Sequence, residues 1–217
     1  NTVVPALGLA VYACVCAAPL KSINNQRRLL TKGLGSLNPI NAVINLGSCQ
    51  LWLLYSALLE DPWLCWTCVM GIVLNMYYFE SCVGLMGIAY GQSILANPKV
   101  EGETKARLDA DYNQLLSAQN ALLSSAIGFT ILYTVLYAHY KIDPEMSLLI
   151  IGTLASTTNY IYFLKYIPQI YIIIRKKDAS SIMPLLVAAD ALNSFLWGTY
   201  GVILGNTNLI YPNVVGF

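Results

Sequence analysis

Two stretches of this sequence match each other: residues 51–62 read LWLLYSALLEDP, and residues 195–206 read FLWGTYGVILGN. An offset of 145 residues pairs Trp52 with Trp197 and Tyr55 with Tyr200. Around them, the same offset pairs Pro39 with Pro184, Asn45 with Asp190, Ser48 with Asn193, Asp61 with Asn206, Leu64 with Leu209, Val69 with Val214 and Gly71 with Gly216. A constant offset over so many positions indicates a duplicated structural unit.

The composition places both copies in a membrane. Of the 217 residues, 57% are hydrophobic and only 11% are charged, whereas a soluble domain carries about 25% charged residues. Apolar runs of about 20 residues are typical of membrane-spanning helices. They predict seven helices, at residues 2–20, 37–59, 62–82 or slightly beyond, 115–138, 146–174, 182–204 and 208–217.

The ends of the chain and one loop carry further expectations. The last ten residues are too few to span a bilayer, and the chain begins at Asn1, so we expect segments missing at both ends. Residues 91–113 are predicted to be a polar loop. Glu103 and Arg107 have the i,i+4 spacing of a helical surface, which indicates that part of this loop extends the helix at 115–138.

The duplicated unit contains three helices, so two copies joined directly would have opposite orientations. A single helix between them restores the same orientation. We therefore predict an all-α integral membrane protein with two parallel three-helix bundles and a linker helix (3+1+3). The predicted boundaries are 1–90 for the first unit, 91–140 for the polar loop and linker helix, and 141–217 for the second unit.

The basic residues predict the orientation of the chain. Most of the 12 Lys and Arg residues fall in alternate loops. By the positive-inside rule, the N-terminus lies outside and the C-terminus on the cytoplasm-equivalent side. The net charge of +1 gives no indication of a nucleic-acid partner.

Catalytic and cofactor-binding motifs are lacking in the sequence. Cys65 and Cys68 form a C-x-x-C spacing without the βαβ context of a redox centre, and His139 is the only histidine. We therefore expect no enzyme activity, catalytic residue, metal site or cofactor.

Several motifs together resemble one family of transporters. Besides the two matching stretches, they are YPNVVGF at residues 211–217 and YIPQIYIIIRKKDASSIMP at residues 166–184. Four prolines also belong to the pattern, namely Pro19, Pro39, Pro168 and Pro184. With them the chain resembles the SWEET (MtN3/saliva) sugar transporter family of the PQ-loop superfamily.

The resemblance implies facilitative, uniport transport of small sugars by alternating access. It places the substrate on the pseudo-symmetry axis, between Trp52 and Trp197 on one pair of walls and Cys68 and Asn213 on the other. The paired polar residues Ser48 and Asn193 complete the candidate substrate-binding set. An indole face packs against the apolar face of a sugar ring, and a carboxamide both donates and accepts hydrogen bonds. The four prolines are candidate hinges, because each removes a backbone hydrogen bond.

One departure from the family keeps other functions open. Family members carry asparagine where this chain has Cys68, which is preceded by Thr67 rather than proline. A thiol is a weak hydrogen-bonding group. The alternatives are a non-transporting structural subunit of a larger membrane complex and a proton-coupled PQ-loop carrier of another small solute.

Charged residues inside predicted membrane helices give a last expectation. Lys165 and Asp190 lie at equal depth on neighbouring helices, which predicts a buried ion pair, with Asp190 as a titrating site if the pair is absent. The expected partners are a small neutral sugar and the lipid bilayer, with a homo-oligomer or larger membrane assembly as an open possibility and no nucleic acid.

Overall fold

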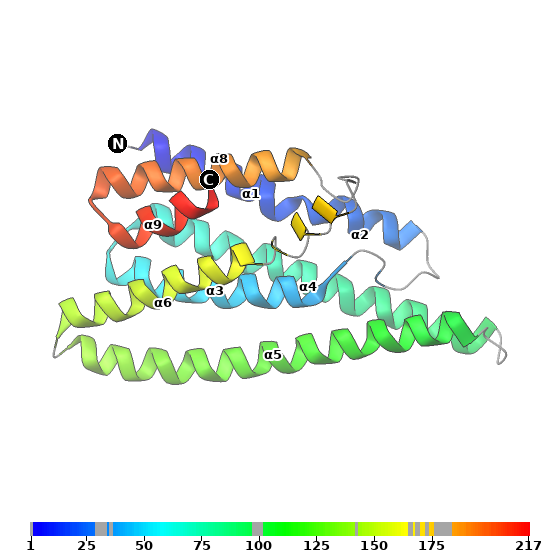
Figure 1. The fold of residues 1–217 in the computed structure, drawn as a ribbon. Helices are drawn as coiled ribbons and strands as arrows, with labels where there is room; N and C mark the ends of the chain where they lie inside the picture. Colours follow the sequence, from blue (N-terminus) through cyan, green and yellow to red (C-terminus); the bar gives the residue numbers. More distant parts are fainter. Residues whose placement is uncertain are drawn as a thin grey trace.

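The computed structural model of the chain is helical throughout the part that it describes, with no strand there (Figure 1). The described residues are 2–28, 34, 37–96, 102–141, 143–164, 167, 170–171, 174–175 and 184–217. The helices are α1 (Val3–Ala17), α2 (Pro19–Arg28), α3 (Pro39–Leu58), α4 (Pro62–Ala96), α5 (Gly102–Tyr140), α6 (Pro144–Leu164), α8 (Pro184–Leu204) and α9 (Thr207–Gly216).

Each of the seven predicted helices has a counterpart, and the all-α membrane fold is confirmed. Three stretches among the described residues are long and apolar enough to cross a bilayer, namely Val3–Arg27, Pro62–Ala89 and Leu108–Tyr140. Side chains of α5 such as Leu123, Ile127 and Ile131 are more than half exposed on its outer face. Apolar side chains at this spacing form one stripe on a helix, as lipid-facing residues do.

The prediction of a polar loop at residues 91–113 was wrong over most of its length. The helix α4 continues to Ala96 and α5 begins at Gly102, so the two helices run on past their neighbours at one end (Figure 1). They continue because they share a core there, in which Leu85 and Met86 of α4 and Leu115 of α5 are buried. The predicted helical extension through Glu103 is confirmed.

Prolines mark where several helices begin rather than where they bend. Pro39 and Pro184 are the first residues of α3 and α8. At the first helical position the missing N–H has no intrahelical partner in any case, so the proline costs no hydrogen bond. The hinge role of the four prolines stays a prediction. Pro19 does follow a break, because it separates α2 from α1, and Pro168 lies outside the described residues.

The helices pack in a two-fold pattern. In the first half α4 contacts both α1 and α3, and in the second half α9 contacts both α6 and α8. Between the halves, α1 packs against α8, and α6 packs against α3. The helix α5 contacts α3, α4 and α6 and lies along one edge of the molecule (Figure 1). This is the arrangement expected of two repeated units with a linker helix outside the repeat, although their residue boundaries stay a prediction.

Two glycines at the 145-residue offset allow the third helix of each unit to approach the other two. A Cβ atom added to Gly71 of α4 would lie 2.6 Å from the Tyr12 hydroxyl and 2.7 Å from Cys49 Sγ. A Cβ atom added to Gly216 of α9 would lie 2.6 Å from Ser194 Oγ. Only glycine fits such close contacts without moving its neighbours.

Candidate substrate cavity

A cavity of about 260 Å³ lies between the two units. Its described lining residues come from α1, α2, α3, α4, α6, α8 and α9, and α5 contributes none of them. All six candidate substrate-binding residues line this cavity, namely Ser48, Trp52, Cys68, Asn193, Trp197 and Asn213. The structure thus brings the predicted set together, and their binding of a substrate stays a prediction.

The two tryptophans occupy equivalent environments in the two units. Trp52 and Trp197 are each 6% exposed, so neither side chain faces lipid. Trp52 makes an edge-on contact with Tyr55, with ring centroids 5.7 Å apart and planes at 77°. Trp197 makes the same contact with Tyr200, at 5.8 Å and 77°. The indoles are therefore held in matching orientations at the cavity wall.

Beyond the tryptophans, crossed hydrogen bonds join the two units at one end of the cavity. The Tyr55 hydroxyl donates to Asn206 Oδ1 over 3.0 Å, and the Tyr200 hydroxyl donates to Asp61 Oδ2 over 3.0 Å. Asp61 Oδ1 also accepts from the backbone N–H of Trp63 and so caps α4. Asn206 caps α9 in the same way. Each cap residue thus binds its own third helix and a tyrosine of the other unit.

Sequence reasoning missed Asn159 of α6, which contacts the first half of the cavity. Its Oδ1 accepts from Trp52 Nε1 over 3.3 Å and from Ser48 Oγ over 3.4 Å. Ser48 Oγ also lies 2.9 Å from Thr158 Oγ1. The run of four polar residues from Ser156 to Asn159 inside a predicted membrane helix is the signal that could have identified it.

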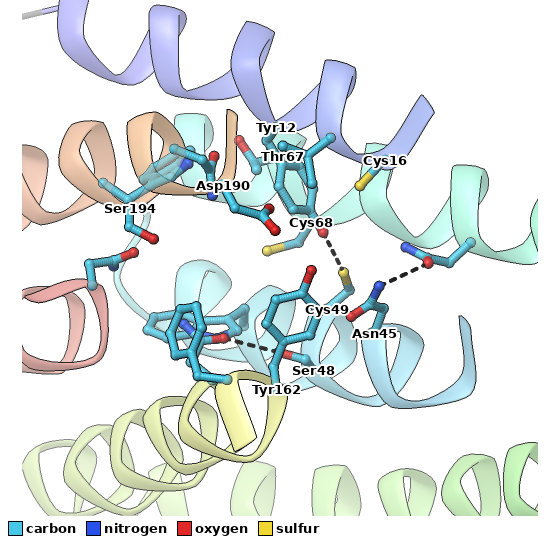
Figure 2. Close-up of a pocket in the computed structure, with 18 of the residues that line it drawn as sticks. Tyr12, Cys16, Asn45, Ser48, Cys49, Thr67, Cys68, Tyr162, Asp190 and Ser194 are labelled. Carbon is cyan, nitrogen blue, oxygen red and sulfur yellow. Dashed lines mark hydrogen bonds between the residues drawn. The ribbon is translucent and has the colours of Figure 1, made fainter. Parts of the chain in front are cut away.

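Further polar contacts lie within the first unit, among α1, α3 and α4. Asn45 Nδ2 donates to Asn75 Oδ1 over 3.3 Å, and Asn75 Nδ2 donates to the Gly71 carbonyl over 2.8 Å. The Tyr12 hydroxyl lies 3.1 Å from Cys49 Sγ. Figure 2 draws dashed lines for the contact between Tyr12 and Cys49, for the bond donated by Asn45, and for a contact of Ser48. None of these residues except Ser48 was a candidate from the sequence.

Thiols and one carboxyl group also face the cavity. Cys16, Cys49 and Cys68 line it, and none of the three forms a disulfide bond. Asp190 lines it from α8, in the same region of the close-up as Tyr12 and Cys68 (Figure 2). The predicted partner of Asp190, Lys165, lies outside the described residues, and so does the proposed ion pair. Among the described side chains, no group of three His, Cys, Asp or Glu residues has a geometry that could hold a metal ion.

The chain is similar in sequence to known sugar transporters. A family model described as "Sugar efflux transporter for intercellular exchange" matches residues 149–217. The bidirectional sugar transporter SWEET10 of Arabidopsis thaliana is 24% identical over 217 residues, which is 100% of this chain and 66% of that protein. The chain therefore spans just under two thirds of the length of this relative.

The fold also matches that of a solved transporter. The 3.7 Å structure of a eukaryotic SWEET transporter superposes with a TM-score of 0.76, covering 99% of this chain and 88% of that one at 13% identity. This likeness shows the seven-helix fold, and the family match and the alignment with SWEET10 supply the sequence relationship. The chain is thus similar to SWEET sugar transporters, in sequence to the family model over residues 149–217 and to SWEET10 along its length, and in fold to the solved transporter.

Proposed function

We propose that this protein carries small neutral sugars across a membrane as a facilitative uniporter working by alternating access. The observation that carries the proposal is the cavity between the two units, walled by two buried indoles in matching orientations. An indole presents an apolar face suited to the C–H face of a sugar ring. The volume of about 260 Å³ is near the lower limit of the range for small-molecule sites, about 300–1,000 Å³, which favours a single sugar ring.

Neutral polar groups dominate the rest of the lining. The Asn213 side chain is oriented by a bond of 2.7 Å from its Nδ2 to the Leu209 carbonyl. An amide fixed in this way presents its oxygen in a defined direction, and hydroxyl donors of a sugar suit such an acceptor. On the opposite wall Cys68 offers little hydrogen bonding, so the two walls differ in the polar contacts they can make.

The crossed tyrosine bonds support alternating access. They hold the two units together only at the end that contains Asp61 and Asn206. A hydrogen bond contributes about 0.5–1.5 kcal/mol net, and about 1.5–3 kcal/mol where one group is charged. Two such bonds are strong enough to favour a closed end and weak enough to break in each transport cycle. In this mechanism the units rock apart at one end as they close at the other.

The loop charges support the orientation proposed from the sequence. The connections that hold Asp61 and Asn206 contain no Lys or Arg. By the positive-inside rule they face outward, which puts the N-terminus outside and the C-terminus on the cytoplasm-equivalent side. The closed end of the cavity is then the outer end.

Uptake of radiolabelled hexoses in a host that lacks hexose transport tests the proposal. The unaltered protein is expected to restore uptake, and Asn213→Ala to abolish it at equal amounts of membrane-inserted protein. Thr199→Ala is the matched control on α8, since its hydroxyl bonds only the Phe195 carbonyl. Correct insertion without uptake of any sugar would reject the transporter and favour the non-transporting subunit.

The position of Asp190 supports a second candidate, a proton-coupled carrier of another small solute. Its side chain lines the cavity from α8, and ionisable groups at such depth are functional candidates. Uptake that rises as external pH falls, and loses this dependence in Asp190→Asn, would favour the coupled carrier. Uptake independent of pH in both proteins supports the uniporter.

A further inference from the structure

The two halves of the cavity match in sequence but differ in their hydrogen bonding. At the 145-residue offset, Ser48 and Trp52 of α3 correspond to Asn193 and Trp197 of α8. In the first half, the Trp52 indole N–H donates to Asn159 Oδ1, and the Ser48 hydroxyl lies 2.9 Å from Thr158 Oγ1 and 3.4 Å from Asn159 Oδ1. A sugar can bond with the Trp52 donor only by displacing Asn159, and with the Ser48 donor only by displacing Thr158 and Asn159.

The second half differs at the two equivalent residues. Asn193 lines the cavity, and its Oδ1 is buried with no hydrogen-bond partner among the described residues. The Trp197 indole lies against Gly8, with Nε1 only 3.2 Å from where a Cβ atom would be. Asn159 accepts a hydrogen bond from the Trp52 indole N–H. Gly8 has no side chain, so it cannot accept the equivalent bond from the Trp197 indole N–H in this way.

A buried amide oxygen without a partner among the described residues requires an explanation, because native structures contain few of them. At a cavity wall, a molecule that occupies the cavity can supply the missing partner. Hydroxyl groups donate readily to an amide oxygen. Asn193 therefore has the acceptor that a sugar hydroxyl would use.

We propose that the substrate binds asymmetrically, with its hydroxyl edge on Asn193 and its apolar face on Trp52. Asn159 is a positioning residue, which fixes the Trp52 indole as a flat wall and occupies Ser48. This inference rests on the proposed function, since it assigns separate roles to the two halves of the same site. It predicts that the sugar binds in one orientation, although the repeated sequence of the two units suggests two equivalent orientations.

Binding of tritiated D-glucose to the purified full chain in lipid nanodiscs tests the inference without relying on transport. Asn193→Ala is expected to weaken binding about 3- to 10-fold, the effect of one hydrogen bond. Ser48→Ala, the matched change in the first half, is expected to reduce the affinity for D-glucose by less than a third of the factor seen in Asn193→Ala. Asn193→Ser, which keeps an acceptor, is expected to recover part of the lost affinity. Thr199→Ala, a substitution outside the cavity, is expected to leave the affinity unchanged.

Competition by the 2-, 3-, 4- and 6-deoxy derivatives of D-glucose separates a contact from a structural effect. For the unaltered protein, one derivative is expected to bind about 3- to 10-fold more weakly than D-glucose, because it lacks the hydroxyl that meets Asn193. Asn193→Ala is expected to lose this discrimination, and Ser48→Ala to keep it. In Asn159→Ala the discrimination is expected to fall, because the freed Trp52 indole N–H then offers a second orientation.

Three results separate the inference from the function on which it rests. Equal weakening by Asn193→Ala and Ser48→Ala, or discrimination that persists in Asn193→Ala, overturns the asymmetric site while sugar transport stands. Glucose binding with the expected asymmetry but no uptake in cells rejects the transport function alone. An unaltered protein that binds none of D-glucose, D-galactose, D-fructose and sucrose overturns both.

Discussion

Tyr200 donates a 3.0 Å hydrogen bond to Oδ2 of Asp61, a residue 139 positions earlier in the chain. Its counterpart at the 145-residue offset is the bond from Tyr55 to Asn206. The duplicated sequence has thus produced a reciprocal pair of contacts between the units. The pair is chemically unequal, because one acceptor is a carboxylate and the other an amide.

Removing either tyrosine hydroxyl is expected to destabilise the folded protein, for different reasons. Tyr200→Phe is expected to cost about 1.5–3 kcal/mol, since the lost bond has a charged acceptor. Tyr55→Phe loses two neutral bonds, to Asn206 Oδ1 and from Asn208 Nδ2, and is expected to cost about 1–3 kcal/mol. Thermal unfolding of the purified protein in detergent measures both, and an unchanged Tm in either variant would show that its bonds contribute nothing.

The close approach of α4 to its neighbours predicts opposite effects of alanine at two of its glycines. Gly71→Ala is expected to destabilise by about 1–3 kcal/mol, because its Cβ atom would overlap Tyr12 and Cys49. A Cβ atom at Gly84, on the same helix, would meet nothing within 4 Å. Gly84→Ala is therefore expected to stabilise by up to about 1 kcal/mol through helix propensity. Thermal unfolding distinguishes the two, and a loss of stability in both would show that packing is not the cause.

The repeat and its helices could be predicted from sequence because they depend on local patterns. Apolar runs locate the helices, and the offset pairs Trp52 with Trp197, both of which line the cavity. The length of α4 was missed because a rule based on bilayer thickness ends the helix near Cys82. Burial of Leu85 and Met86 against α5 carries it to Ala96.

Contacts between the units could not be predicted from the offset. An internal repeat aligns Ser48 with Asn193, but it does not say which residue of the other unit lies opposite either of them. Asn159 reaches Trp52 because α6 packs against α3. The corresponding packing of α1 against α8 brings Gly8 to Trp197. The asymmetry of the cavity therefore follows from packing between the repeats.

The bond from Trp52 to Asn159 predicts a difference in stability between two otherwise equivalent tryptophans. Trp52→Phe loses both indole packing and the 3.3 Å bond, whereas Trp197→Phe loses mainly packing. We expect Trp52→Phe to be the more destabilising by about 0.5–1.5 kcal/mol. In an Asn159→Ala background the difference is expected to shrink, which a double-mutant cycle of unfolding free energies measures. An unchanged difference would mean that the bond contributes nothing.

The last prediction concerns Cys68, which lines the cavity with Asn213 of the other unit. The residue is 4% exposed. Cys68→Asn adds a carboxamide that both donates and accepts, whereas the thiol does so weakly. We expect Cys68→Asn to strengthen D-glucose binding about 3- to 10-fold, the effect of one added neutral hydrogen bond. Cys68→Ala is the matched control, because it removes the thiol without adding a polar group, and it is expected to change binding by less than about twofold. Weaker binding by Cys68→Asn, with normal thermal stability, would show instead that the small side chain is what the substrate requires at this wall.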